Sequence, residues 1–404
     1  RQGLTPKSPT PQGRAFVFPG RPTCPQSARA MALPGRGAKQ SRMPMKTTAN
    51  RSARATKGRG ATLNPEGRFE REAREPEDDG WTGDPDEDSR RTPTIVSPES
   101  AKTVLSRNDS PDLGFSRSLN PYRGCEHGCI YCYARPSHAY LGLSPGLDFE
   151  TRLFAKDNAA ACLRAELGRP GYRCEPIHIG SNTDGYQPVE RTRRITRSVL
   201  EVLHETSHPV AIVTKSALVE RDLDLLEPMA REGLVAVSIS VTTLRADLAR
   251  RLEPRASAPA RRLQAIERLA RSGVPVGVNV APVIPFLTDH EMEPTLEEAA
   301  ARGARWASWT LLRLPWEVKM LFRDWLAVHF PLKAKHVMSR LHDLRGGRDN
   351  DPRFGTRMKG EGPIADLLAR RFQVATARLG IATRPPVLRA DAFRPREGRQ
   401  PCLF

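Results

Sequence analysis

The chain has 404 residues, enough for one large domain or two small ones, and no apolar run in it is long enough to cross a membrane as a helix. The net charge of +18 first suggests a nucleic-acid partner. However, residues 1–62 contain 13 Lys and Arg and no Asp or Glu, which leaves only +5 for the rest of the chain. The bulk charge of the remaining chain therefore says little about its partners.

The first part of the chain has the composition of an unfolded segment. Residues 1–62 are rich in Pro, Gly, Ser and Arg and bury little apolar surface, so we expect a disordered basic arm. Because the chain starts with Arg1, we interpret this arm as an upstream extension with a natural start at Met43 or Met45. Residues 63–93 are charged and irregular.

From Thr94 onward, strand and helix patterns alternate along the chain. The expected strands are 176–180, 210–214, 235–241, 274–280 and 305–310. The expected helices are 151–167, 191–206, 220–232, 259–272 and 288–301. With the strand that leads into Cys125, these elements make six βα units over 94–310, which predicts an α/β fold with a parallel sheet and right-handed crossovers.

Three further helices are expected beyond the last strand, at 314–330, 333–344 and 364–379. They make a C-terminal helical extension over 311–390, followed by a tail, 391–404. The loop 353–362 between them is basic and rich in glycine, so its backbone amides and arginines are candidates for holding phosphate, although loop flexibility explains the glycines equally well.

Three cysteines crowd one short segment. Cys125, Cys129 and Cys132 have the spacing Cys-x3-Cys-x2-Cys, and three thiolates on one loop can hold three irons of a [4Fe–4S] cluster, leaving the fourth iron open to a small ligand. A structural zinc site is the alternative, with His127 as a fourth ligand. We otherwise expect His127 to face solvent. With seven cysteines in the chain, an odd number, a disulfide role is disfavoured.

This spacing, with Tyr131 just before the last cysteine, resembles the radical S-adenosylmethionine (SAM) superfamily. The wider match, from Asn120-Pro121-Tyr122 to Tyr133, is similar to the DNA-repair photolyase-like branch, which includes spore photoproduct lyase. The resemblance extends upstream to Lys57-Gly-Arg-Gly-Ala61 and Asp78-Asp79-Gly-Trp81. It implies an open (β/α)6 partial TIM barrel, and the βα pattern fits that expectation.

The resemblance also implies a reaction. In that superfamily, one electron from the cluster splits SAM and yields a 5′-deoxyadenosyl radical, which takes a hydrogen atom from the substrate. We therefore expect a [4Fe–4S] cluster, SAM, and an electron donor such as flavodoxin or ferredoxin in a reducing cytoplasm. Nucleic acid is one candidate substrate. The remaining hypotheses are a nucleic-acid binding module with a cluster or zinc, and a maturation protein that serves as a scaffold.

Strand ends carry functional residues in such folds, so the SAM contacts are sought there. By resemblance, Tyr131 packs on adenine, Lys215 or Arg255 meets the SAM carboxylate, and a polar loop after the second strand reaches the amino group. Side chains two apart on one strand are expected to meet the ribose. The full set of candidates is Tyr131, Thr183, Asp184, Lys215, Ser238, Ser240, Arg255 and Asn279. Each has an ordinary structural alternative, such as a helix cap for Asp184.

Two positions bear on the reaction type. Spore photoproduct lyase uses a cysteine hydrogen donor at the end of strand two, where this chain has Ser181, and this departure argues against the lyase reaction. Tyr133 matches a tyrosine of that enzyme's radical-transfer path. Cys162 is expected to be a buried hydrophobic residue rather than a donor, and Cys174 is no obvious donor either. Finally, Gln400–Phe404 resembles a sliding-clamp-binding peptide.

Overall fold

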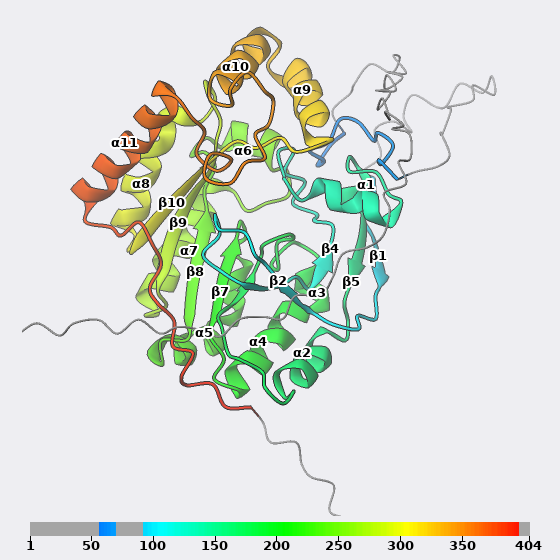
Figure 1. Cartoon of the computed structure of the whole chain (residues 1–404), viewed down its shortest axis with the longest axis vertical. Coiled ribbons are helices and arrows are strands. Elements are labelled where there is room, and N and C mark those ends of the chain that lie inside the picture. Colours follow the sequence, from blue (N-terminus) through cyan, green and yellow to red (C-terminus); the bar gives the residue numbers. More distant parts are fainter. Residues whose placement is uncertain (1–55, 70–91, 396–404) are drawn as a thin grey trace, which may run out of the picture. The chain divides into compact units, whose positions relative to one another are not determined.

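The computed structural model describes residues 56–69 and 92–395, and its centre is a seven-stranded sheet (Figure 1). Its strands in spatial order are β10 (Trp306–Leu311), β9 (Val276–Val283), β8 (Val235–Ser240), β7 (Val210–Thr214), β6 (Ile177–Ile179), β3 (Arg117–Leu119) and β2 (Leu105–Arg107). All neighbours from β3 to β10 are parallel, and only β2 is antiparallel. The predicted α/β fold with a parallel sheet is confirmed.

The strands form where short runs of β-branched residues occur between helices. Val210, Ile212, Val235 and Val237 are fully or almost fully buried, as expected for strands covered on both faces. The helices that follow the strands pack against the sheet and one another as an outer layer. They are α4 (Ile195–Glu205), α5 (Leu223–Arg231), α7 (Pro259–Arg271) and α8 (Met292–Ala301).

The expected helix 151–167 was wrong in its first half. Residues 148–151 form the short helix α1 (Asp148–Thr151), Arg152–Ala155 form strand β5, and α2 is only Ala159–Leu167. β5 lies between β1 (Ile95–Pro98) and β4 (Tyr122–Arg123) in a separate three-stranded sheet. Its alternating side chains Leu153 and Ala155 are buried, so pairing with distant segments decides the conformation.

Other helices are shorter than expected. The helix 191–206 is divided at Arg194, whose φ of 53° interrupts it between α3 (Glu190–Arg193) and α4. The helices 220–232 and 288–301 begin as the 3-10 turns η3 (Ala217–Asp222) and η4 (Asp289–Glu291). Strand β9 is longer than expected, because it continues through Ala281 and Pro282 to Val283.

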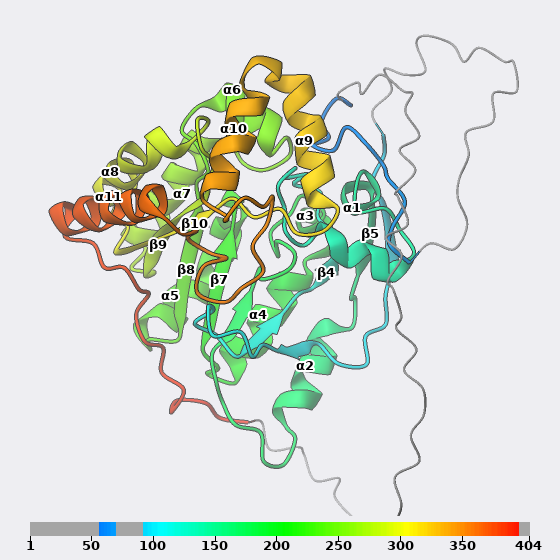
Figure 2. The ribbon, with the colours of Figure 1, turned by 45° about the horizontal axis from the view of Figure 1, so that its top comes forward.

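The C-terminal extension consists of α9 (Val318–His329), α10 (Pro331–Asp343) and α11 (Pro363–Leu379). Helix α11 packs on α8, at one side of the sheet (Figures 1 and 2). Helices α9 and α10, with α6 (Ala246–Leu252), belong to a second apolar cluster that also contains Cys129, Ile130 and Tyr131. Helices α9 and α10 of the extension therefore share an apolar cluster with the cysteine segment, whereas α11 belongs to the main core.

The loop of residues 351–359 connects the two edges of the main sheet, and we call it the closing loop. On one side, Leu311 N on β10 donates to Met358 O at 2.8 Å. On the other side, Asp112, shortly after β2, accepts from Gly355 N at 2.7 Å and from Arg357 Nε at 2.5 Å. Gly355 N and Arg357, two of the donors considered for phosphate, are thus occupied by a carboxylate of the protein itself.

Two further expectations concern the ends of the chain and the membrane. Most of the basic arm, the segment around Asp78-Asp79-Gly80-Trp81 and the clamp-binding peptide Gln400–Phe404 lie outside the described residues. Among the helices that the structure describes, none combines the length and the apolar character needed to span a bilayer.

Candidate iron–sulfur and SAM site

The cysteine segment is a tight loop that follows β3 and β4. Gly124 and Gly128 have φ of 76° and 67°, which favour glycine. Backbone hydrogen bonds fix the loop: Cys125 N donates to Phe149 O at 2.9 Å, and Cys132 N donates to Cys129 O at 3.1 Å. These constraints hold Cys125, Cys129 and Cys132 on one short loop after β3, and functional side chains of such folds gather where the parallel strands end.

His127 is buried and lies against Asp184, with Nδ1 3.3 Å from Asp184 Oδ2. The expectation that His127 faces solvent was wrong, because its ring is buried against the Asp184 carboxylate. Within residues 56–69 and 92–395, no three His, Cys, Asp or Glu side chains converge as the ligands of a single metal ion would. The contact with Asp184 engages the His127 ring, so its placement gives no support to the Cys3His zinc site that we considered.

The three thiols fit an iron–sulfur cluster better. All three are free, and burial raises the pKa of Cys125, Cys129 and Cys132 above the ordinary value. The charges of Lys215 and Arg135 oppose this rise at Cys129 and Cys132 respectively. Buried thiolates need positive charge beside them, which cluster irons supply when bound.

Thr183 and Asp184 fasten the loop after β6 to its surroundings. Asp184 accepts from Thr214 Oγ1 at 2.7 Å and from Lys215 N at 2.8 Å, so it joins the end of β7 to the cysteine loop through His127. Burial opposes its ionisation, but His127 and these donors hold the pKa of Asp184 at about 2. Thr183 Oγ1 donates to Tyr122 O at 3.1 Å. Both side chains are thus engaged by the protein itself.

Lys215 and Tyr131 lie together around the buried carboxylate of Glu253. Lys215 Nζ is 3.8 Å from Glu253 Oε1 and 5.8 Å from the centre of the Tyr131 ring. The Tyr131 hydroxyl donates to the same carboxylate, and Arg262 forms an ion pair with it. Burial favours the neutral acid, but Arg262 and Lys215 lower the pKa of Glu253 to about 2. Glu253 is therefore an ionised hub beside the cysteine loop.

The residues expected at the ribose and adenine lie on neighbouring strands. Ser240 on β8 and Asn279 on β9 are register partners, and Asn279 is in turn the partner of Ser308 on β10. Ser308 Oγ donates to Asn279 Oδ1 at 3.2 Å. Ser238 lies two residues before Ser240 on β8, and it accepts a hydrogen bond from Trp306 Nε1 at 3.3 Å. The row Ser240, Asn279 and Ser308 thus gives a polar edge.

Arg255 contacts the cysteine loop from outside this row. Its guanidinium is 3.1 Å from Glu126 Oε1 and donates to Thr94 Oγ1 at 3.2 Å, and its amide donates to His127 O at 3.2 Å. The structure therefore places Arg255 as a brace of the loop. Of the two candidates for the SAM carboxylate, Lys215 is the one whose charge acts on the thiols, because it opposes the rise in the pKa of Cys129 and Cys132.

Tyr133 and Ser181 are in direct contact, since the Tyr133 hydroxyl donates to the Ser181 carbonyl oxygen. Half of the Tyr133 side chain is exposed, and the Arg313 guanidinium lies 5.7 Å from its ring centre. Arg313 Nη1 contacts Met358 of the closing loop at 3.5 Å, and its Nε has no partner among the described residues. The Arg313 cation thus lies beside the half-exposed ring of Tyr133, the residue that directly follows Cys132 in the chain.

Several residues that organise the site were missed by the sequence reasoning. Asn120 Oδ1 accepts from Asn182 N and Thr183 N and shapes the loop after β6. Gln187 accepts a hydrogen bond from Glu126 N and donates one to Gly124 O on the cysteine loop. Glu253 lies two residues before Arg255, which the sequence indicates as a candidate for the SAM carboxylate. Only the placement of polar residues in apolar surroundings could have indicated them.

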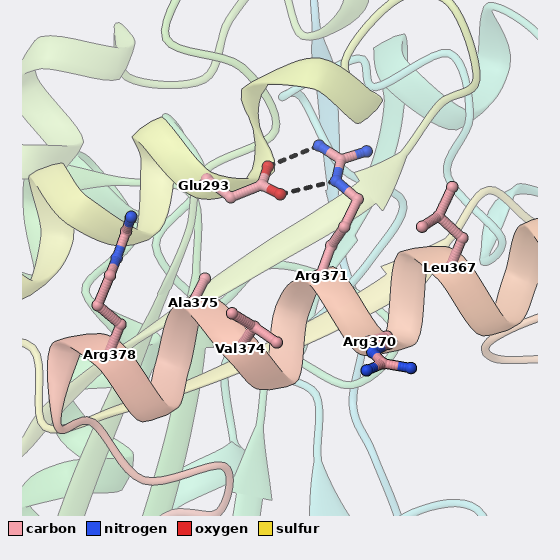
Figure 3. Close-up of a pocket in the computed structure, with 7 residues that line it drawn as sticks. All are labelled: Glu293, Leu367, Arg370, Arg371, Val374, Ala375 and Arg378. Atoms are coloured by element: carbon pink, nitrogen blue, oxygen red, sulfur yellow. Dashed lines mark hydrogen bonds and ion pairs between the residues drawn. The ribbon is translucent and has the colours of Figure 1, made fainter.

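The surface pocket of Figure 3 does not belong to this site. Its lining residues come from α8 and α11, and the Glu293 carboxylate is paired with Arg371 at 2.6 Å (Figure 3). None of the cysteine-loop residues line it.

Comparison with known proteins places the chain in a family. Residues 119–299 match the model of the radical SAM superfamily. An uncharacterised protein of Mycobacterium tuberculosis, Rv2578c, is 37% identical over 261 residues, which are 64% of this chain and 75% of that protein. An uncharacterised protein of Methanocaldococcus jannaschii, MJ0683, is 27% identical over 173 residues, 43% of this chain and 62% of that one.

Solved structures show a similar fold. Spore photoproduct lyase complexed with dinucleoside spore photoproduct superposes with a TM-score of 0.51 at 17% identity, covering 70% of this chain and 79% of that one. A variant of the same enzyme with bound AdoMet gives 0.50, also at 17% identity, covering 71% and 79%. These structures show the fold, and the match to the family model together with the 37% identical relative shows that the chain belongs to the radical SAM superfamily, whose enzymes use a [4Fe–4S] cluster and SAM.

Proposed function

We propose that this enzyme reductively cleaves SAM to a 5′-deoxyadenosyl radical and uses that radical on a nucleic-acid substrate. The observation that supports the first part is the presence of three free thiols on one loop, two of them buried and one partly buried, with the charge of Lys215 acting on Cys129 and Cys132. Cys125, Cys129 and Cys132 would hold the cluster, which supplies one-electron reduction when bound.

The protein's own groups have defined tasks in this proposal. Lys215 provides positive charge for the SAM carboxylate, and Glu253 keeps that ammonium and the Tyr131 ring in place. Ser240 and Asn279 offer hydroxyl and amide groups to the ribose and adenine, as neighbours across β8 and β9. Asp184 and Thr183 hold the loop after β6 in position, so they act by orientation.

The charge around Tyr133 supports an anionic substrate. Burial lowers the pKa of Arg313, and the charge of Arg357 lowers it further, so two cations lie close together. Arg357 is paired with Asp112, but Arg313 has no ion-pair partner in the described part of the chain. A phosphate group would supply the missing acceptor, and the exposed Tyr133 ring offers a face for stacking.

Three further statements belong to the same proposal. We interpret the six parallel strands with their helices as a (β/α)6 partial barrel, whose strand ends carry the site. The electron comes from a small donor such as flavodoxin or ferredoxin, in a reducing cytoplasm. The reaction differs from that of spore photoproduct lyase, since Ser181 has no thiol to give a hydrogen atom.

The test is anaerobic reconstitution of the full chain with iron and sulfide, followed by dithionite reduction with SAM. We expect about four irons per chain and release of 5′-deoxyadenosine. The variant with alanine at all three loop cysteines is the control, and it should hold no cluster. A wild-type protein that binds four irons but leaves SAM intact contradicts the proposal.

The substrate is tested separately with deuterated DNA or RNA. Deuterium that appears in 5′-deoxyadenosine shows that the radical took hydrogen from the nucleic acid. Arg313→Gln should lower this transfer on the order of tenfold while uncoupled SAM cleavage persists, because one charge-assisted contact is worth about 1.5–3 kcal/mol. Unlabelled 5′-deoxyadenosine with every nucleic acid tried would rule out this substrate class.

A further inference from the structure

The segment Lys57–Ala61, at the start of the described residues, lies against the cysteine loop. In Figures 1 and 2 this blue stretch runs beside α1 and α9. Gly60 lies so close to the loop that an added Cβ would be 1.7 Å from Gly128 O and 3.4 Å from Ile130 N. No other residue type fits there without moving the loop backbone, because real Cβ atoms never approach a carbonyl oxygen that closely.

A buried carboxylate joins this segment to the loop. Glu150 is fully buried, and its two oxygens accept from Gly60 N at 2.9 Å and Ala61 N at 2.8 Å. The same carboxylate pairs with the buried Arg135. Arg135 Nε in turn donates to Cys129 O at 2.9 Å. Two backbone amides of a distant segment therefore complete the ion pair that holds the central cysteine.

The Glu150 carboxylate also leaves no space for a side chain at Gly128 of the cysteine loop. An added Cβ on Gly128 would meet Glu150 Oε2 at 2.7 Å, and Gly128 already has a φ of 67°. Gly128 is thus enclosed between Gly60 on one side and Glu150 on the other. A side chain at either glycine would therefore push the loop backbone out of this arrangement.

Arg59 fixes the segment in this position. Its guanidinium is buried and donates to Glu150 O at 3.0 Å, to Thr92 O at 2.6 Å and to Thr94 Oγ1 at 3.0 Å. Arg255, the brace of Glu126, also donates to Thr94 Oγ1. The two arginines therefore connect the segment with the first half of the cysteine loop.

We propose that Lys57–Ala61 is a positioning element of the cluster site, which sets the conformation of the cysteine loop and closes it to solvent. Arg59, Gly60, Glu150 and Arg135 act through the loop backbone and touch no sulfur. Groups of this kind around a metal site typically change metal retention on the order of 10- to 100-fold when they are lost. The segment is far in sequence from the cysteines, yet its backbone completes their setting.

The experiment compares Gly60→Ala with Gly114→Ala in the full chain after anaerobic reconstitution. Gly114 is the matched control, because an added Cβ there meets nothing within 4 Å and its φ is not positive. For Gly60→Ala we expect less than half the iron of wild type, an altered electron paramagnetic resonance signal of the reduced cluster, and bleaching in air on the order of tenfold faster. Gly114→Ala should match wild type in all three.

A merely structural role would lower the thermal midpoint and leave the resonance signal and the bleaching rate unchanged, and that result overturns the proposal. If Gly60→Ala has no native circular dichroism, Arg59→Gln decides by the same three readouts, since it keeps every backbone contact of the segment. None of these readouts needs SAM cleavage or nucleic acid. The outcome is therefore independent of the function proposed above.

Discussion

Lys215 Nζ lies 3.8 Å from Glu253 Oε1, so the cation assigned to SAM faces a carboxylate of its own protein. This separation is long for a charge-assisted hydrogen bond, which is about 2.7–2.9 Å. Arg262 is the closer partner of Glu253 and already balances its charge. The Lys215 ammonium is therefore available to a second anion without leaving Glu253 unpaired.

Lys215→Met should weaken SAM binding and leave the iron content unchanged. The lost contact is charge-assisted, so we expect on the order of 10- to 100-fold weaker binding. Equilibrium binding of SAM to the reconstituted protein measures it. Lys319→Met on the exposed face of α9 is the control. Equal affinity in both variants would show that Lys215 serves only Glu253.

Glu253→Gln should destabilise the fold by about 3–5 kcal/mol, because Arg262 would be left buried without its counter-charge. The double variant Glu253→Gln with Arg262→Met should recover part of that loss. Urea unfolding measures all of them. The exposed pair Glu227 and Arg231 is the control, and Glu227→Gln should change the free energy of unfolding by less than about 1 kcal/mol. Similar losses at both sites would contradict the hub role of Glu253.

His208 gives a dependence of stability on pH. Burial lowers the pKa of His208 to about 4. Its ring is hydrogen-bonded to the Tyr172 hydroxyl and packs edge-on against Phe393. The unfolded chain, with an ordinary pKa of 6.5, binds the proton first, so stability falls as pH drops from 6.5 to 4. His208→Gln should flatten this fall when urea midpoints are compared across that window. His290→Gln, on the surface, should leave it as in wild type.

Asp112→Ala should loosen the closing loop. Its carboxylate holds Gly355 N and Arg357, and neither donor has another carboxylate in the described residues. Hydrogen–deuterium exchange should therefore become faster at amides 355–359, with little change in the strands. Asp391→Ala, which removes an exposed partner of Arg389, serves as the comparison. Arg345 Nη1 also donates to Arg357 O of this loop, at 2.6 Å. Unaltered exchange at 355–359 would show that this bond and the one from Leu311 N to Met358 O hold the loop without Asp112.

Much of the sheet was predictable because its strands are short apolar runs with helices between them. The runs at Val210 and Val235 have that pattern, and they pair in the expected parallel order. Strand β5 was not predictable in this way. Residues 152–155 carry a pattern that a helix also fits, and β1, which pairs with them, lies more than 50 residues earlier in the chain. Local preference could not decide between the two.

For the site, the sequence located the loop and not its support. The cysteine spacing is a local signal, so Cys125, Cys129 and Cys132 could be recognised. Glu150 and Glu253 hold the loop from distant positions, and a glutamate in a sequence reads as a surface residue. Their burial follows from contacts with Gly60 and Arg262 that only the fold creates. His127 was misjudged for the same reason.

The hydrogen bonds of the closing loop to Asp112 and Leu311 join the β2 side of the main sheet to its β10 side. For the nucleic acid that we propose as substrate, these bonds would close the sideways route between β2 and β10. The reacting unit of such a polymer would then enter as a chain end or as a nucleotide extruded from its neighbours, so the proposal favours melted or damaged strands over intact duplex.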